Sequence, residues 1–369
     1  MTIDQAVELL EHEPLASLGK QAHEKRRLLN PEPIVTYNID RNINYTNICQ
    51  NECKFCAFYR PKGHPEAYVL SREQLYEKIE QTRLLGGNQI LLQGGINPDL
   101  SLDWYVDLLR DLKSKFPWLH IHGFSPTEIY HLSCKEQLEE QLAVSGQQLE
   151  NEPTTPHSSL LTPHFSPLTA IKTVLQKLKQ AGLASLPGGG AEILVDAVRQ
   201  QVSPKKASAD QWLNVCRQWA SLGGKGTATM MFGCTETIRQ RVEHLDRIRT
   251  LQDETGVFTA FIPWTFQPKN TKLSDVPKAT LSDYLRMLAL SRLFLDNVKH
   301  IQASWVTQGL ENGALALRFG ADDFGSLMIE ENVVAAAGTC FKTDLEHMLD
   351  AIRSAGFQPV RRDVFYNKI

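Results

Sequence analysis

The chain has 369 residues, of which 42% are hydrophobic and 22% charged, and its formal net charge is −3. The length suffices for one large domain or two modest ones, and the composition is that of an ordinary globular protein. No basic block stands out, which makes nucleic acid a poor partner, and no apolar run approaches the ~20 residues that cross a bilayer. Seven cysteines without a signal-peptide pattern disfavour a secreted disulfide framework, so the cytoplasm is the expected location.

Residues 1–30 are expected to form a separate helical segment, followed by one large domain over residues 31–369. After the first expected strand come Cys49, Cys53 and Cys56, a Cys-x3-Cys-x2-Cys spacing on one short loop. A closed iron–sulfur or zinc site normally takes four protein ligands. Three thiolates around a four-iron cube leave one iron open to bind a small molecule, so the spacing indicates chemistry rather than bracing.

A structural zinc site is the alternative interpretation of this loop, with His64 as the fourth ligand. His64 lies eight residues past Cys56, which is longer than the usual spacing of about two to four residues between zinc ligands. A zinc-stabilised binding module without catalysis therefore stays open as a second class of function. The other cysteines are scattered singly and are expected to be small packed hydrophobes: Cys134, Cys216, Cys234 and Cys340.

Along the rest of the chain, short apolar strands alternate with amphipathic helices. The run 71–74 resembles a capping box before a helix to about residue 85, and Ser166-Pro167 predicts another helix start. Further helices are expected at 101–115, 208–222, 236–254, 280–296, 310–318 and 343–355. Strands are expected in the segment before Cys49 and at 89–93, 120–125, 184–186, 226–233, 259–264, 300–305 and 323–329.

Eight strand–helix units in a row favour a parallel (β/α)8 barrel of the TIM type. Residues 131–165 break the rhythm because they are rich in Gln, Glu, Ser, Thr and Pro. Within them, 136–143 is compatible with a short helix. The rest is expected to be a polar surface insertion, since it cannot bury much apolar surface.

The short motifs of the chain follow the ends of the expected strands, where barrels of this kind place their active residues. The cysteine loop follows strand one, Gly94-Gly95 follows strand two, and Ser125-Pro-Thr-Glu128 follows strand three. Strands four, five and six are followed by 187–192, 233–236 and 264–268.

These motifs resemble those of the radical S-adenosylmethionine (SAM) superfamily. The cysteine spacing is that superfamily's signature, Phe55 matches its usual aromatic residue, and Gly94-Gly95 matches its motif for the methionine end of SAM. The run 229–233 with Glu236 resembles its adenine-side motif. The resemblance implies that the protein holds a [4Fe–4S] cluster and SAM, and that an electron from the cluster cleaves SAM to a 5′-deoxyadenosyl radical.

Within the superfamily, the segments 41–60, 183–193 and 261–268 resemble the menaquinone (futalosine pathway) branch. That branch includes aminofutalosine synthase and cyclic dehypoxanthinyl futalosine synthase, and its relatives include the two halves of the deazaflavin (FO) synthase. The segments 262–268 and 324–332 look most like the cyclase. The resemblance then implies hydrogen removal from C4′ of a ribose and ring closure on a benzoate, with the sister reactions as alternatives.

The resemblance also implies cofactor-binding residues. Glu192 would bind the ribose or amine of SAM, with Arg199 as a second polar contact, and Phe55 and Phe58 would stack beside the adenine. Ordinary helix capping and core packing are the alternatives. The branch further implies a small-molecule substrate, a futalosine derivative, and an electron donor such as flavodoxin or ferredoxin.

Acid–base and substrate-binding residues are expected at later strand ends. His122 and Glu128 flank Ser125 at strand three and are the candidate proton acceptors, because histidine titrates near neutral pH and a buried carboxylate needs a partner. Two basic pairs, 205–206 and 361–362, are expected to be solvated surface. The candidate substrate contacts, which barrel-core packing would equally explain, are Ser125, Trp264, Gln267 and Trp305.

Overall fold

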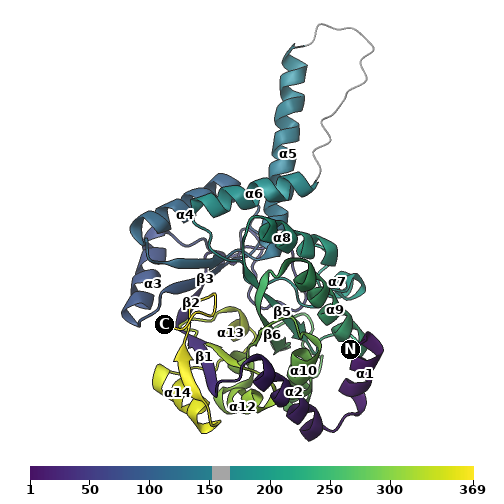
Figure 1. Ribbon diagram of the computed structural model, residues 1–369. Helices are drawn as coiled ribbons and strands as arrows, with labels where there is room; N and C mark the ends of the chain where they lie inside the picture. The colour runs from purple at the N-terminus through teal and green to yellow at the C-terminus, as the bar shows by residue number, and fades with distance from the viewer. Residues whose placement is uncertain (152–166) are drawn as a thin grey trace.

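A computed structural model describes residues 1–151 and 167–369. At its centre is a ring of parallel strands wrapped by helices (Figure 1). The predicted (β/α)8 barrel is confirmed. Strand one is broken at Ile39 into β1 and β2, and the segment 184–186 supplies the fourth strand. The named strands are β1 Ile34–Asn38, β2 Asp40–Asn44, β3 Gln89–Gln93, β4 His120–Gly123, β5 Gly226–Phe232, β6 Phe258–Thr265, β7 His300–Ile301 and β8 Asp323–Ser326.

Backbone hydrogen bonds close the ring. Pairing runs β2–β3–β4 and β5–β6–β7, and the segment 184–186 bridges the two groups through His122↔Ser185 and Leu186↔Gly226. The last strand meets the first: Thr36 N donates to Asp322 O at 3.1 Å and Leu327 N to Asn38 O at 2.9 Å. All carboxyl ends therefore meet at one mouth.

The helices begin where the sequence predicts, because their capping residues form. Ser71, Ser208, Thr237 and Thr280 each accept a backbone N–H from the first turn of the helix that follows. The outer helices are α3 Arg72–Leu84, α4 Leu102–Lys115, α5 Pro126–Asn151, α6 Pro167–Ala181, α7 Asp196–Val202, α8 Ala209–Ser221, α9 Ile238–Thr255, α10 Leu281–Phe294, α11 Trp305–Gln308, α12 Leu310–Ala316, α13 Val333–Ala336 and α14 Leu345–Ser354.

The N-terminal segment forms α1 Ile3–His12 and α2 Leu15–Leu29, which pack against α9 and α10. A separate unit over residues 1–30 stays a prediction. The apolar core lies between the strands and the outer helices, where Trp212 and Trp219 are the largest fully buried side chains. Among the described residues, no helix is both long enough and apolar enough to cross a membrane.

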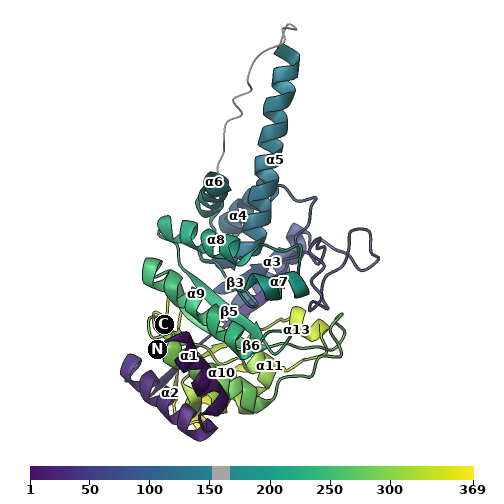
Figure 2. The same cartoon turned by 90° about the vertical axis from the view of Figure 1, so that its right-hand side faces the viewer.

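The prediction of a surface insertion at residues 131–165 is partly wrong. Instead of a short helix at 136–143, α5 runs without a break from Pro126 to Asn151 and projects away from the barrel (Figures 1 and 2). Its first turns are anchored by Ile129 and Leu132, which are buried. Gln, Glu, Leu and Ala are good helix formers, so a polar composition did not exclude helix here. Residues 152–165 of the expected insertion, and the Ser166 cap, lie outside the described residues.

The role of the C-terminal segment was not predicted. A ninth strand, β9 Gln358–Arg361, pairs with β1 beside the barrel floor. Arg362, expected on the surface, is instead buried: its Nε and Nη2 donate to Asp323 at 2.5 and 2.8 Å. The Tyr366 ring stacks on His300 with centroids 3.7 Å apart. The segment after β9 therefore closes the floor of the barrel.

The buried ion pair at the floor predicts a large stability difference. The Arg362→Met substitution leaves Asp323 buried without its cation, so we expect the free energy of unfolding to fall by about 3–5 kcal/mol in urea denaturation followed by circular dichroism. The matched control is Arg353→Met, because the Arg353 side chain is 52% exposed and pairs with Asp350 on the surface of α14. The control should leave stability nearly unchanged, and equal losses in both variants would contradict the buried pair's role.

Candidate active site in the barrel mouth and lumen

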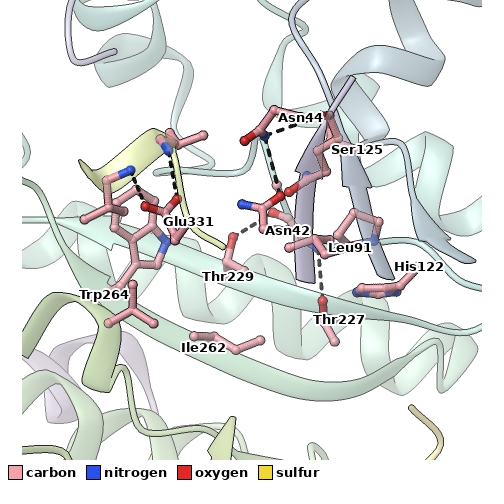
Figure 3. A pocket seen from close by; sticks show the side chains of 18 of the residues that line it. Asn42, Asn44, Leu91, His122, Ser125, Thr227, Thr229, Ile262, Trp264 and Glu331 are labelled. Carbon is pink, nitrogen blue, oxygen red and sulfur yellow. Dashed lines mark hydrogen bonds between the residues drawn. The ribbon is translucent and has the colours of Figure 1, made fainter. Parts of the chain in front are cut away.

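A cavity of about 420 Å³ starts at the mouth of the barrel and continues down its lumen. Strand one lines it with every second residue, which places four polar side chains on the inward face: Asn38, Asp40, Asn42 and Asn44. Across the lumen stand Thr227 and Thr229 from β5, with Ile262 and Trp264 from β6 (Figure 3). Barrel interiors are usually filled by branched aliphatic side chains, so this polar lining indicates a ligand space.

The cysteine loop forms the wall of the cavity at the mouth, where all three thiols line it. The loop is fixed by its own backbone: Cys49 N donates to Arg60 O at 3.0 Å, and Cys56 N donates to Cys53 O at 3.1 Å. The Arg60 guanidinium also donates to the carbonyls of residues 57, 58 and 59. The loop is therefore built to present its thiols inward.

The surroundings of the thiols keep them protonated in the absence of a metal. Burial raises the pKa of Cys53 to about 12, which the nearby Lys206 cation partly opposes and the neighbouring Cys49 and Cys56 thiols reinforce. Burial likewise raises the pKa of Cys56. Both groups are thus neutral thiols at pH 7 until a metal displaces their protons.

The geometry does not support zinc with His64. His64 is exposed, does not line the cavity, and its Nδ1 accepts a hydrogen bond from Glu66 N at 3.1 Å. Among the described residues, no group of three His, Cys, Asp or Glu side chains converges on a point fit for one metal ion. Each ligand of a four-iron cluster binds a different iron, so such thiols need not meet at one point.

Gly94 and Gly95 let the cysteine loop rest on the end of β3. A Cβ on Gly95 would lie 2.2 Å from Ile48 O and 2.8 Å from the Cβ of Cys49, and one on Gly94 would strike the Tyr45 ring at 2.5 Å. Gly95 N donates to Thr46 O at 3.0 Å. Both glycines line the cavity, so the motif brings bare backbone to the ligand space.

Glu192 follows the glycine run 188–190, and its carboxylate faces the cavity. Lys206 Nζ donates to Glu192 Oε1 at 2.6 Å, and the Nζ lies 5.2 Å from the centre of the Phe55 ring. Burial disfavours charge on Lys206, but Glu192 and Cys53 outweigh it and raise the pKa of the ammonium. Lys206 was expected on the surface; its side chain is only 9% exposed and lines the cavity.

Several buried polar atoms at the mouth have no hydrogen-bond partner among the described residues. They are Oε2 of Glu192, Oδ1 of Asn51 and Oγ1 of Thr127, and all three residues line the cavity. An unpaired buried polar atom costs about 1–3 kcal/mol. A ligand with amine and hydroxyl donors, such as SAM, fits this set of acceptors.

Arg199, Glu236 and Gln267 do not line the cavity. Arg199 lies behind the glycine run, where its Nη1 donates to Ala191 O at 2.7 Å. Glu236 accepts from the backbone N–H of Gly233 at 2.6 Å, and Gln267 donates to Thr265 O at 2.9 Å. Each of the three therefore braces a strand end. Besides the three cysteines, Gly94, Gly95 and Glu192, the predicted residues that line the cavity are Phe55, Phe58, His122, Ser125, Glu128, Trp264 and Trp305.

Glu128 is engaged on both carboxylate oxygens. Oε1 accepts from Tyr45 OH at 2.7 Å and Gly94 N at 3.0 Å, and Oε2 accepts from both the N–H and the hydroxyl of Ser125 at 2.7 Å. Ser125 and Glu128 thus form a capping box at the start of α5. Burial raises the pKa of Glu128, although these donors oppose it. The arrangement ties three strand ends together.

His122 is the other predicted acid–base residue, and it stands in the lumen wall (Figure 3). Its Nδ1 shares a hydrogen bond of 2.6 Å with Ser185 Oγ. Burial lowers the pKa of His122 to about 3, with His120 and Arg362 adding to the effect. The ring is therefore a neutral imidazole at pH 7.

The polar lining from strand one was not predicted, although the sequence carries its signal. Asn38, Asp40, Asn42 and Asn44 recur with the period of two that puts strand residues on one face. Their side chains bond within the lumen: Asn38 Nδ2 donates to Gln89 Oε1 at 3.1 Å, and Gln89 Nε2 donates to Asp40 Oδ2 at 2.9 Å. Such a network is fixed before a ligand arrives.

Comparisons with known proteins agree with the resemblance. Residues 43–248 match the radical SAM superfamily, and residues 255–369 match the CofH/MqnC C-terminal region. A cyclic dehypoxanthine futalosine synthase of Halalkalibacterium halodurans is 44% identical, covering 100% of this chain and 91% of that protein. One of Streptomyces coelicolor is 38% identical, with 100% and 86% covered. A 5-amino-6-(D-ribitylamino)uracil–L-tyrosine 4-hydroxyphenyl transferase of Methanopyrus kandleri is 34% identical, with 95% and 88% covered.

Solved structures share the fold. Methylornithine synthase superposes with a TM-score of 0.70 at 18% identity, covering 98% of this chain and 94% of that one. The FeFe-hydrogenase maturase HydG of Carboxydothermus hydrogenoformans gives a TM-score of 0.71 at 15% identity, with 99% and 77% covered.

This chain belongs to the radical SAM superfamily and to the branch marked by the CofH/MqnC C-terminal region. It is therefore an enzyme whose cofactors are a [4Fe–4S] cluster and SAM. The three thiols at the mouth would hold the cluster, and the unpaired acceptors beside them would face SAM.

The cysteine loop predicts the iron content of the reconstituted protein. Anaerobic reconstitution should give about four irons per chain, as one cube requires, and the Cys53→Ala variant should lose the brown chromophore and SAM cleavage. Cys216→Ala is the matched control, because Cys216 is buried within α8 and does not line the cavity. Full SAM cleavage by Cys53→Ala would contradict the assignment of the loop.

The close contact at Gly95 predicts a second loss of iron. In Gly95→Ala the new methyl group meets the Ile48 carbonyl, so the cysteine loop must shift and the iron bound per chain should fall to less than half. For comparison, Gly63→Ala in the same loop region meets nothing within 4 Å and adds only the strain of its left-handed backbone. Iron analysis after gel filtration checks both, and a Gly95→Ala protein with full iron would disprove the packing argument.

Proposed function

We propose that this chain is a radical SAM cyclase that converts dehypoxanthine futalosine into cyclic dehypoxanthine futalosine in menaquinone biosynthesis. The observation that carries the proposal is the lumen, open at the mouth and lined in part by polar side chains, that continues directly from the three thiols. Two proteins named for this reaction are related to the chain over its full length, which supports the same assignment.

The reaction needs a shielded space. When bound, the cluster and SAM supply a 5′-deoxyadenosyl radical after reduction by an external donor such as a flavodoxin or a ferredoxin. A primary carbon radical must be kept from water and held within roughly 3–4 Å of one C–H bond. The lumen suits this need because strands close its sides and the segment after β9 closes its floor.

The lining offers partners for each part of the substrate. Asn42, Asn44 and Thr229 can hydrogen-bond the ribose hydroxyls, and Trp264 and Trp305 can pack against the benzoate ring. A polar donor or cation should hold the benzoate carboxylate. In the proposed reaction the ribose C4′ loses a hydrogen atom, that carbon bonds to the ring, and the ring regains aromaticity by losing a proton and an electron.

The two predicted acid–base residues then take different roles. We assign His122 as the acceptor of the ring proton. The residue lines the lumen, and one of its ring nitrogens forms no hydrogen bond with a described residue. Glu128 is a positioning residue in this proposal, because its four donors tie Tyr45, Gly94 and Ser125 into one wall.

A sister reaction is the second candidate. The relative from Methanopyrus kandleri, named a tyrosine 4-hydroxyphenyl transferase, is 34% identical over 95% of this chain. Aminofutalosine synthase, which joins the adenosyl radical to an enolpyruvyl benzoate, uses the same cofactors.

Anaerobic turnover separates the candidates. Reconstituted enzyme, reductant and SAM are incubated in parallel with dehypoxanthine futalosine, with the enolpyruvyl benzoate, and with tyrosine plus the ribitylaminouracil. We expect a product lighter than the first substrate by two hydrogens, detected by mass spectrometry, and 5′-deoxyadenosine in equal amount. Turnover of only the second or third mixture would disprove the cyclase assignment.

A further inference from the structure

We propose that His122, Ser185 and His120 form a relay that carries the proton released at ring closure out of the lumen through the barrel floor. This inference rests on the cyclase function, because it is that reaction which frees a proton inside an enclosed space.

One hydroxyl joins two imidazoles. Ser185 Oγ lies 2.6 Å from His122 Nδ1 and 2.8 Å from His120 Nε2. A serine hydroxyl has one proton to donate and lone pairs to accept, so it can accept from one imidazole while it donates to the other. The three groups therefore form a directed chain along which a proton can pass by successive transfers.

The backbone of the barrel holds the three groups of the relay in position. His122 and His120 lie two residues apart on β4 and so on the same face of the strand. The facing segment places Ser185 opposite His122 in a parallel bridge, and Gly123 N donates to Ser185 O at 3.1 Å. Ser185 is fully buried, so no solvent competes for its hydroxyl.

The two ends of the relay differ in their access to solvent. His122 lines the lumen and is 7% exposed, and its Nε2 forms no hydrogen bond with a described residue. His120 is half-buried at the opposite end, where its ring meets the edge of Phe365 with centroids 5.4 Å apart. Phe365 is 45% exposed, so this end lies close to solvent.

The carboxyl groups of the lumen are committed elsewhere. Among the described residues four of them line the cavity. Glu128 accepts four hydrogen bonds and Glu192 pairs with Lys206. Glu331 accepts three backbone N–H groups at the start of α13. Asp40, held by two side chains, is the remaining competitor for the proton and enters the test below.

Both imidazoles start neutral, as a relay requires. Burial, together with the neighbouring His120 and Arg362, lowers the pKa of His122 to about 3. Burial lowers the pKa of His120 to about 4, with Asp363 opposing and Lys113 assisting. A weak base suffices here, because the departing proton restores an aromatic ring and is therefore acidic.

The ring C–H bond breaks and its electron pair stays in the ring, while one electron leaves to a one-electron acceptor of the iron–sulfur class. The proton enters at His122 Nε2. In concert, the Nδ1 proton of His122 moves to Ser185 Oγ, the hydroxyl proton moves to His120 Nε2, and His120 releases its Nδ1 proton toward solvent. Both histidines end in their opposite tautomers and reset before the next turnover.

The test separates hydrogen abstraction from proton loss. Substrate deuterated at C4′ is turned over anaerobically by wild type, Ser185→Ala, Ser185→Thr and His120→Gln. Deuterium in 5′-deoxyadenosine reports abstraction, and cyclic product per deuterated 5′-deoxyadenosine reports completion. In Ser185→Ala and His120→Gln we expect deuterium transfer to persist while that ratio falls by about tenfold to a hundredfold. Ser185→Thr keeps the hydroxyl and should therefore show the wild-type ratio.

Three outcomes would overturn the relay. A wild-type ratio in both Ser185→Ala and His120→Gln shows that the proton leaves by another route. If the ratio of cyclic product to deuterated 5′-deoxyadenosine stays at the wild-type value in Ser185→Ala but falls in Asp40→Asn, then Asp40 is the group that accepts the proton. If wild type transfers no deuterium from C4′, the cyclase function itself fails and the relay with it. Iron content and circular dichroism confirm that each variant is folded and loaded.

Discussion

The closure of the strand ring between the first and the last strand is the constraint on which the site depends. Hydrogen bonds from Thr36 to Asp322, from Leu327 to Asn38 and from Ile329 to Asp40 join the two ends of the sheet. Because all strands are parallel, closure brings every carboxyl end to one mouth. Residues as far apart in sequence as the cysteine loop, the glycine run and Glu128 then line one cavity. An open sheet of the same strands would leave them spread along an edge.

Inside this ring, polar side chains hydrogen-bond to one another. Asn38, Gln89 and Asp40 form a chain of hydrogen bonds, and the Arg362–Asp323 pair covers the floor. Buried polar groups without partners are costly, and three such acceptors lie at the mouth, where a ligand should supply the donors. The Oε2 of Glu192 is one of them.

Much of the barrel was readable from the chain because its signals are local. The strand at 89–93 and the capping box at Ser71 depend on periodicity and on neighbours three residues away. Lys206 and Arg362 were misread as surface because basic pairs usually are, and only distant partners, Glu192 and Asp323, reveal their burial. The long helix α5 was not predicted because the polar composition of residues 131–165 resembles that of a loop, although many of these residues have high helix propensity. Arg199, Glu236 and Gln267 were expected to contact a ligand but bond to neighbouring backbone instead, which spacing alone cannot reveal.

The two ends of the lumen impose opposite requirements on the same strands. At the mouth, glycines and thiols bring bare backbone and anionic ligands to a cofactor, and Lys206 supplies the compensating charge. Toward the floor, charge is neutralised in pairs and the imidazoles of β4 are held neutral by burial. A radical generated at the mouth reacts without protons, whereas restoring aromaticity releases one. A closed barrel that shields the radical therefore also traps that proton, unless the wall contains a path for it. The hydroxyl shared by two histidines is such a path, and it lies on the side of the lumen away from the radical's source.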